Sequence, residues 1–251
     1  MNRLELEAVL KKGGIENYRF EAKELLNAFK SDVLDLKIKQ RLSGVPLQYL
    51  LGEWEFYSLP MLVGSGVLIP RPETELLIDI AKTLIDKNSV CIDLCSGSGA
   101  IAITINKTIG SKTYALEKYE DALSFLEKNI ALNGADVTII KEDVFKFSTD
   151  LKFDLIISNP PYIKTDDLPL LQKEVSFEPK TALDGGKDGL MFYKHISSFK
   201  SMLKENGAIL FEVGFDQADD VCEILTKNGF KTKIFKDLSG VQRAVLGTLT
   251  H

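Results

Sequence analysis

The chain has 251 residues, of which 45% are hydrophobic and 27% are charged, a balance typical of a folded globular protein and not of a disordered or fibrous chain. Its formal net charge is -5. Because an acidic chain is not drawn to phosphate backbones, we expect no stable binding to nucleic acid. The three cysteines and two histidines lack the spacing of a disulfide framework or a metal cage, so we expect neither.

No stretch of the chain has the ~20 consecutive apolar residues that cross a bilayer, and the first residues lack the apolar segment of a secretion signal. We therefore expect a cytoplasmic protein without membrane association, and we expect it to be a monomer.

Three short amphipathic helices are predicted within residues 1–43, because apolar residues recur there at helical spacing. The apolar positions are Leu4, Leu6, Val9 and Leu10, then Phe20, Leu25, Leu26 and Phe29, then Val33, Leu34, Leu36, Ile38 and Leu42. Ser31 and Asp32 are residue types that cap helices, and Gly44 is typical of a helix end. Residues 44–72 mix strand formers with turn formers, which predicts a linker containing a β-hairpin.

Residues 73–251 alternate helical patterns with short apolar runs, which predicts an α/β, doubly wound, Rossmann-like sheet. Strands are expected at 90–94, 113–116, 137–140, 155–158, 208–213, 231–235 and 243–247, and helices at about 73–86, 98–108, 119–133, 187–204 and 215–228. The connection over residues 163–187 is long for a compact domain, and such loops are usually functional or disordered.

A turn rich in small residues follows the first of these strands, where the backbone can approach a ligand at a helix N-terminus. It comprises Asp93, Cys95, Ser96, Gly97, Ser98 and Gly99. A nicotinamide-dinucleotide site favours a G-x-G-x-x-G pattern, whose third glycine is replaced by Ala102. The turn therefore predicts a nucleotide-like cofactor of another kind.

Acidic residues follow the next two strands. Glu117 lies 20 residues after Gly97, where a carboxylate can accept hydrogen bonds from ribose hydroxyls. Asp143 is placed to accept from an adenine amino group, with Val144 and Phe145 available to pack on the ring. Ligands of open parallel sheets bind at the carboxyl ends of the strands, so we expect these residues to form one cofactor site.

The tetrapeptide Asn159-Pro160-Pro161-Tyr162 follows the fourth strand. Each proline keeps the preceding residue out of the helical region and lacks an N–H. The acceptors that remain are the Asn159 side-chain carbonyl and the Pro160 backbone carbonyl. Two such acceptors can hold both N–H bonds of an –NH2 group and stabilise positive charge that develops on its nitrogen. Tyr162 can stack on the planar group that carries the nitrogen.

On these residues the sequence resembles the release-factor glutamine methyltransferases, the HemK family of class I methyltransferases. The resemblance covers nearly the whole chain. It runs through residues 44–49, 68–75, 93–102, 158–163, 178–179, 182–183, 185–190 and 214–217. The tetrapeptide alone is also similar to that of adenine-N6 DNA and some rRNA methyltransferases, whereas residues 70–75 and 178–190 indicate the HemK family.

The resemblance implies a seven-stranded sheet with an antiparallel last strand, S-adenosylmethionine as cofactor, and class 1 peptide release factors as partners. The acceptor is then the amide nitrogen of the glutamine in their Gly-Gly-Gln motif, held by Asn159, Pro160, Pro161 and Tyr162. Asn159 is also expected near the cofactor methyl group, and the N-terminal helical domain is expected to dock the release factor. Cys95 departs from the family, which often has glycine there, and the helical domain is short.

Two alternatives remain open at this point. One is an amino-methyltransferase that acts on adenine or guanine of nucleic acid, which requires a basic groove and a flipped base; the acidic composition disfavours it. The other is a catalytically silent binding module that uses the fold to hold a protein partner. The intact tetrapeptide disfavours this second alternative.

Overall fold

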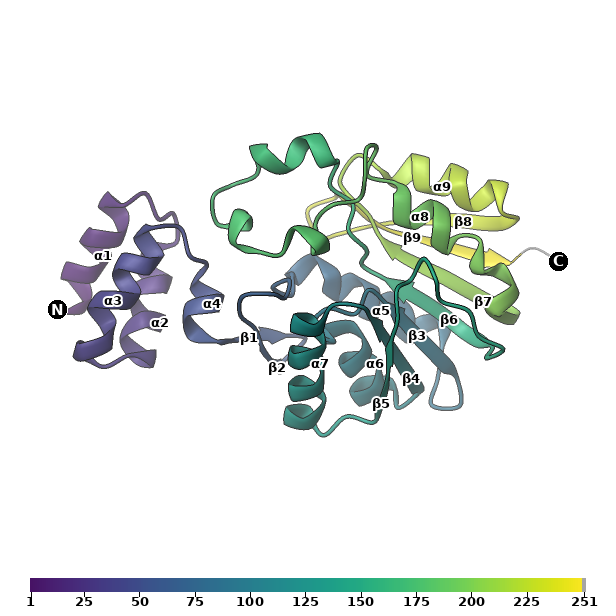
Figure 1. Ribbon diagram of the computed structural model, residues 1–251, viewed down its shortest axis with the longest axis horizontal. Helices are drawn as coiled ribbons and strands as arrows, with labels where there is room; N and C mark the ends of the chain where they lie inside the picture. The colour runs from purple at the N-terminus through teal and green to yellow at the C-terminus, as the bar shows by residue number, and fades with distance from the viewer. Residues whose placement is uncertain (250–251) are drawn as a thin grey trace.

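The computed structural model describes residues 1–249 and consists of a small N-terminal helical unit joined to an α/β domain (Figure 1). The helical unit contains α1 (Arg3–Lys12), α2 (Tyr18–Ala28) and α3 (Ser31–Leu42). Their apolar faces meet in a core of Leu6, Leu10, Ala22, Leu25, Leu34 and Ile38. The three predicted helices are therefore present. The predicted cap is wrong, because Lys30 precedes α3 and Ser31 is its first helical residue, with no side-chain cap.

The linker contains a short helix in addition to the expected hairpin. Helix α4 (Leu47–Leu51) packs Leu47 and Leu50 into the core of the helical unit. Strands β1 (Glu53–Phe56) and β2 (Leu59–Leu62) form the hairpin, with Tyr57 and Ser58 both at positive φ. A two-residue hairpin turn with positive φ at both residues has a backbone twist that matches the right-handed twist of the paired strands.

Seven strands form the sheet of the α/β domain, in the order β5-β4-β3-β6-β7-β9-β8. The strands are β3 (Val90–Leu94), β4 (Lys112–Glu117), β5 (Val137–Lys141), β6 (Phe153–Ser158), β7 (Leu203–Glu212), β8 (Phe230–Lys236) and β9 (Gln242–Leu249). Strand β9 is antiparallel to both of its neighbours. The doubly wound sheet with an antiparallel last strand is thus confirmed.

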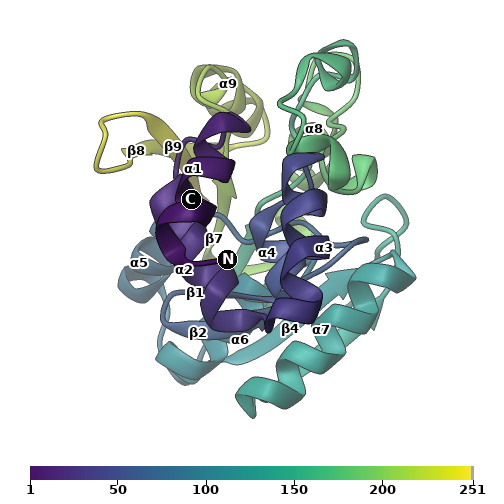
Figure 2. The same cartoon turned by 90° about the vertical axis from the view of Figure 1, so that its left-hand side faces the viewer.

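Helices cover both faces of the sheet (Figure 1). Residues of α5 (Glu75–Leu84) and α6 (Ala100–Ile109) belong to the core on one face, and residues of α8 (Met191–Ile196) and α9 (Ala218–Lys227) belong to the core on the other. Helix α7 (Glu120–Asn133) packs against β2 and α6. Figure 2 shows the helical unit in front of the end of this layered domain. Among residues 1–249, no helix is long and apolar enough to cross a membrane.

The helix predicted over residues 187–204 is wrong in length. Only α8 is α-helical there, followed by a 3-10 turn over Phe199–Met202, and β7 already begins at Leu203. Gly186 and Gly189 both have positive φ, and a side chain on Gly189 would meet the Tyr162 carbonyl oxygen. A helix starting at residue 187 is therefore excluded, because both glycines have a left-handed backbone and Gly189 also lies against the tetrapeptide.

Asn129 of α7 joins three parts of the domain. Its side chain is fully buried; its Oδ1 accepts from the Leu62 amide at 2.6 Å, and its Nδ2 donates to the carbonyls of Leu62 at 3.1 Å and Ser98 at 2.9 Å. The hairpin and the glycine-containing turn after β3 are thereby held to one helix. The linker hairpin is thus part of the framework that positions this turn.

Asn129→Leu is expected to lower the free energy of unfolding by about 2–4 kcal/mol, because each buried backbone group left without a partner costs about 1–3 kcal/mol. Urea unfolding measures the change. Glu127→Leu, which places the same residue on the exposed face of α7, is the control and is expected to change stability by less than about 0.5 kcal/mol. Similar losses in both variants would contradict the bridging role.

Candidate functional site

The carboxyl ends of three parallel strands meet at one edge of the sheet. Strand β3 pairs in parallel with β4 on one side and with β6 on the other. The turn over residues 95–99, the segment over residues 117–119 and the tetrapeptide over residues 159–162 therefore emerge side by side. This is the edge at which open α/β sheets bind ligands.

The turn after β3 is held by Glu117. Glu117 Oε2 accepts from the Gly97 amide at 2.9 Å, and its Oε1 accepts from the amides of Lys118 and Tyr119 at 2.8 and 2.9 Å. A carboxylate has about four acceptor positions, so about one remains for a ligand. Glu117 thus has a structural role that the sequence analysis did not predict, beside the predicted role in binding.

Three residues of the turn lie in the left-handed region, with φ of 62° at Cys95, 54° at Gly97 and 83° at Gly99. A non-glycine residue rarely adopts this conformation. The position of Cys95 is therefore one that favours glycine. The left-handed backbone is a physical reason why the family often has glycine there. Burial raises the pKa of the Cys95 thiol, so the side chain is neutral.

Gly97 and Gly99 are glycines for different reasons. A side chain on Gly97 would meet nothing within 4 Å, so the space above it is open. A side chain on Gly99 would lie 2.4 Å from Leu126 Cδ1, and Gly99 is not among the residues that line the cavity. Gly97 leaves room for a ligand, whereas Gly99 allows α6 and α7 to pack closely.

Asp93 lies beneath the turn and does not line the cavity. It is fully buried, and within residues 1–249 no group reaches hydrogen-bond geometry with either carboxylate oxygen, although the Ser96 hydroxyl and the Ala102 amide interact with the carboxyl group weakly enough to lower its pKa less than burial raises it. Burial raises the pKa of Asp93 to about 8. The side chain is thus largely protonated at neutral pH, and its predicted contact with a cofactor remains a prediction.

Asp143 and Val144 lie at the cavity after β5, as predicted. The Phe145 amide donates to Asp143 Oδ1 at 3.0 Å, and the Lys118 ammonium lies 3.0 Å from Asp143 Oδ2. Partial burial alone would raise the pKa of Asp143, but these two groups outweigh it and lower the pKa. Asp143 therefore stays ionised and available as an acceptor. Lys118 was not predicted from the sequence, although its position directly after Glu117 was a signal.

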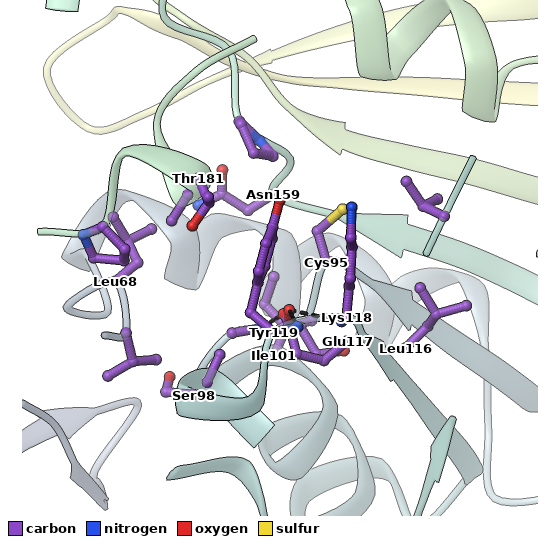
Figure 3. A pocket seen from close by; sticks show the side chains of 18 of the residues that line it. Leu68, Cys95, Ser98, Ile101, Leu116, Glu117, Lys118, Tyr119, Asn159 and Thr181 are labelled. Carbon is purple, nitrogen blue, oxygen red and sulfur yellow. Dashed lines mark hydrogen bonds between the residues drawn. The ribbon is translucent and has the colours of Figure 1, made fainter. Parts of the chain in front are cut away.

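The cavity connects the strand ends to the tetrapeptide. Figure 3 shows Asn159 and Thr181 on one side of it and Ser98, Ile101 and Glu117 on the opposite side. Of the predicted residues, the lining includes Cys95, Ser96, Gly97, Ser98, Glu117, Asp143, Val144, Asn159 and Pro161, and it excludes Asp93, Gly99, Pro160 and Tyr162. Phe145, which was expected to pack on the adenine ring, also lines it. The lining further includes residues that were not predicted: Gly66, Val67, Leu68, Pro70, Arg71, Thr74, Ala100, Ile101, Leu116, Lys118, Tyr119, Ala122, Glu142, Pro179, Thr181, Ala182 and Phe192.

The predicted pair of acceptors has no competing protein donor. Asn159 Nδ2 donates to Thr74 Oγ1 at 3.2 Å, which leaves Asn159 Oδ1 without a partner within residues 1–249. In the same part of the chain, no group donates to the Pro160 carbonyl oxygen. Because Asn159 lines the cavity, one acceptor is available there and the second lies on the adjacent residue.

The Tyr162 backbone is fixed by contacts with two other segments of the chain, at Gly185 and at Gln217. Gln217 Nε2 donates to the Tyr162 carbonyl at 2.9 Å, and a side chain on Gly185 would meet the Tyr162 backbone at 2.7 Å. Burial raises the pKa of the Tyr162 hydroxyl to about 12. The tyrosine is therefore neutral and fixed, and its predicted stacking on a substrate remains a prediction.

The long connection after the tetrapeptide closes one side of the cavity. It contains three 3-10 turns, Thr165–Leu170, Val175–Phe177 and Lys180–Ala182. Glu178, which is 4% exposed, accepts from the Ile69 amide at 3.0 Å and from the Arg71 guanidinium. This ion pair joins the connection to residues 69–74, so the two segments that most favoured the family resemblance contact each other at the cavity.

Comparison with known proteins places the chain in a family. Residues 72–207 match the model of the methyltransferase small domain. The chain is 39% identical to the release factor glutamine methyltransferase of Thermodesulfovibrio yellowstonii over 83% of this chain and 78% of the relative. It is 37% identical to that of Clostridium botulinum over 94% of each chain.

The chain belongs to the release factor glutamine methyltransferase family. A further member, from Fusobacterium nucleatum, is 38% identical over 90% of this chain and 66% of its own length. A solved methyltransferase from Pyrococcus furiosus, only 18% identical, has the same fold, with a TM-score of 0.61 over 77% of this chain and 90% of that chain.

The contrast between the two glycines in this family member predicts a difference in stability. Gly99→Ala is expected to lower the free energy of unfolding by about 2–5 kcal/mol, from the left-handed backbone and from overpacking against Leu126. Gly97→Ala carries only the backbone cost of about 1–2 kcal/mol. Urea unfolding of both variants measures the difference. Equal losses would show that the space above Gly97 is not open.

Proposed function

We propose that this chain transfers a methyl group from S-adenosylmethionine to the side-chain amide nitrogen of a glutamine in peptide chain release factors, the glutamine of their Gly-Gly-Gln motif. The observation that carries the proposal is the pair of free acceptors on Asn159 and Pro160, beside a cavity that also contains Glu117 and Asp143. An –NH2 group on a planar carbonyl matches two acceptors held on adjacent residues.

The residues of the cavity suit S-adenosylmethionine. Glu117 has about one acceptor position free for a ribose hydroxyl, and the space above Gly97 accommodates a ligand against the backbone. Asp143 is ionised and can accept from the adenine amino group. Val144, Phe145 and Phe192 supply apolar surface for the ring. We assign the cofactor to Cys95, Ser96, Gly97, Ser98, Glu117, Asp143 and Val144.

When bound, S-adenosylmethionine supplies an electrophilic methyl group. An amide nitrogen is a weak nucleophile because its lone pair is delocalised, so the protein has to act by orientation and by dipoles. Asn159 Oδ1 and the Pro160 carbonyl accept the two N–H bonds, aim the nitrogen and stabilise positive charge as the nitrogen leaves conjugation. The prolines fix this backbone in advance, and Tyr162 packs beside the planar group.

We assign docking of the release factor to the helical unit together with the long connection after the tetrapeptide. The Arg41 guanidinium, which is 3% exposed, bonds Glu21 of α2 and also Glu174 of the connection at 2.6 Å. This contact supports the assignment because it holds the helical unit beside the segment that closes the cavity. We further propose that the protein acts as a monomer and forms no stable complex with nucleic acid.

The direct test is methyl transfer from radiolabelled cofactor to purified release factor, to duplex DNA and to rRNA. The proposal predicts label in the release factor alone, and none in a release factor whose Gly-Gly-Gln glutamine is replaced by alanine. Label in either nucleic acid, with none in the release factor, would support the amino-methyltransferase alternative and reject the proposal.

Glu117→Ala is expected to weaken the binding of S-adenosylmethionine by about 1–3 kcal/mol, the scale for losing hydrogen bonds to a charged group. Both the free acceptor position and the anchor of the Gly97 amide are lost. Calorimetry measures the affinity. Glu120→Ala, which removes an exposed carboxylate outside the cavity, is the control and is expected to bind normally. Normal binding by Glu117→Ala would remove Glu117 from the site.

A further inference from the structure

A buried carboxylate lies behind the Asn159 side chain. Glu212 is the last residue of β7, and its neighbour Phe211 pairs with Ser158 of β6, so Glu212 and Asn159 follow paired residues of adjacent strands. Glu212 is 3% exposed, and its Oε2 has no hydrogen-bond partner within residues 1–249. The Thr74 side chain, itself 4% exposed, accepts from Asn159 Nδ2 at 3.2 Å, and its hydroxyl interacts with the Glu212 carboxyl group closely enough to lower the pKa of that group.

The chemistry of these groups fixes the direction of each hydrogen bond. A threonine hydroxyl has one proton, and an ionised carboxylate can only accept. The Thr74 proton therefore goes to Glu212, and Thr74 Oγ1 has to accept from Asn159 Nδ2. The two ends of an asparagine amide are nearly the same size and can exchange by rotation. With this arrangement, the end of Asn159 that is left for the cavity is its carbonyl oxygen.

We propose that Thr74 and Glu212 are positioning residues that hold the Asn159 amide with its carbonyl oxygen toward the substrate –NH2 group. This inference rests on the proposed function, which supplies the –NH2 group. Without Thr74 or Glu212, the Asn159 amide can rotate, and its own –NH2 group then faces the N–H bonds of the substrate. Two donors cannot bond each other, so the nitrogen of the substrate is no longer aimed. Thr74 is the last residue of the Pro72–Thr74 turn, so this turn is the element that brings the hydroxyl to Asn159.

Two variants of Thr74 test the proposal. Thr74→Val keeps the volume but removes the hydroxyl, and kcat for release-factor methylation is expected to fall by about 10- to 100-fold, below the ~10²–10³ typical of deleting a preorganised contact itself. Thr74→Ser keeps the hydroxyl and is expected to retain kcat within about threefold. In both variants, cofactor affinity by calorimetry and KM for the release factor are expected to stay within about twofold of the wild type. A Thr74→Val variant with wild-type kcat, or a Thr74→Ser variant as slow as Thr74→Val, would overturn the proposal.

A second measurement does not depend on methyl transfer. The Asn159 side-chain amide resonances in a nitrogen-15 NMR spectrum can be assigned by their absence from Asn159→Asp. Hydrogen bonding to Thr74 is expected to slow the exchange of one amide proton with solvent in the wild type and in Thr74→Ser, but not in Thr74→Val. Equal exchange in all three would overturn the positioning role. If the wild type shows this protection and yet methylates no release factor, the proposed function fails and the positioning role stands.

The pH dependence gives a third readout, because Glu212 has to be ionised to receive the Thr74 proton. Burial raises the pKa of Glu212 to about 7. The charged and titratable groups that act on Glu212 or respond to it are Glu73, which raises its pKa, Arg243 and Arg71, which lower it, and Tyr162 and Tyr193, which stay neutral. As pH falls through this pKa, the carboxyl gains a proton that it can donate to Thr74, and the amide is released to rotate.

We therefore expect kcat to fall as pH decreases through about 7 in the wild type. In Glu212→Gln, where this group no longer titrates, the profile is expected to be flat across that range, with a kcat below that of the wild type at pH 8. An unchanged pH profile in Glu212→Gln would overturn the role of Glu212.

Discussion

The parallel pairing of β3 with both β4 and β6 is the constraint on which the site depends. It places the ends of three strands at one edge, although they lie between residues 94 and 158 of the chain. Glu117 then fixes the turn after β3 by accepting from the Gly97 amide. The two sides of the cavity, to which the proposed function assigns the cofactor and the substrate, are thus positioned by backbone pairing and one carboxylate, before any ligand contributes.

The tetrapeptide leaves two of its carbonyl oxygens without a protein donor. The prolines supply no N–H groups. Thr74 Oγ1 accepts from the Asn159 amide nitrogen, and Gln217 Nε2 donates to the Tyr162 carbonyl. The carbonyl oxygens of Asn159 and Pro160 are left for a ligand. A site with free acceptors discriminates against substrates that lack two N–H donors, because buried acceptors left without partners are costly. This gives a physical basis for selecting an amide –NH2 group.

Much of this arrangement could be predicted from the sequence. The strands were predictable because short apolar runs alternate with helical patterns. The location of Glu117 and of the tetrapeptide at one edge of the sheet was predictable because parallel strands end there, whereas their roles in binding stay predictions. Contacts between distant segments were not predictable. Glu178 meeting Arg71, and Glu212 lying behind Asn159, follow from the tertiary fold alone.

The errors also have tertiary causes. The helix expected from residue 187 is replaced by turns because Gly185 and Gly189 lie against the Tyr162 backbone. The contact of Gly99 with a cofactor stays a prediction, and the structure adds a packing role, because the missing side chain makes room for Leu126. Local sequence does not distinguish a glycine that admits a ligand from one that admits a neighbouring helix. Only the packing of α6 and α7 separates the two cases.

In the proposed function, the carbonyl groups of Asn159 and Pro160 aim the acceptor nitrogen. The most direct test is the single-turnover rate of methyl transfer to release factor by Asn159→Ala at saturating cofactor, with the unfolding midpoint measured on the same sample. Because one of the two preorganised acceptors is lost, the rate is expected to be lower by about 10²–10³ with the fold intact. A folded Asn159→Ala protein that transfers methyl groups to the same nitrogen at the wild-type rate would contradict this role of Asn159.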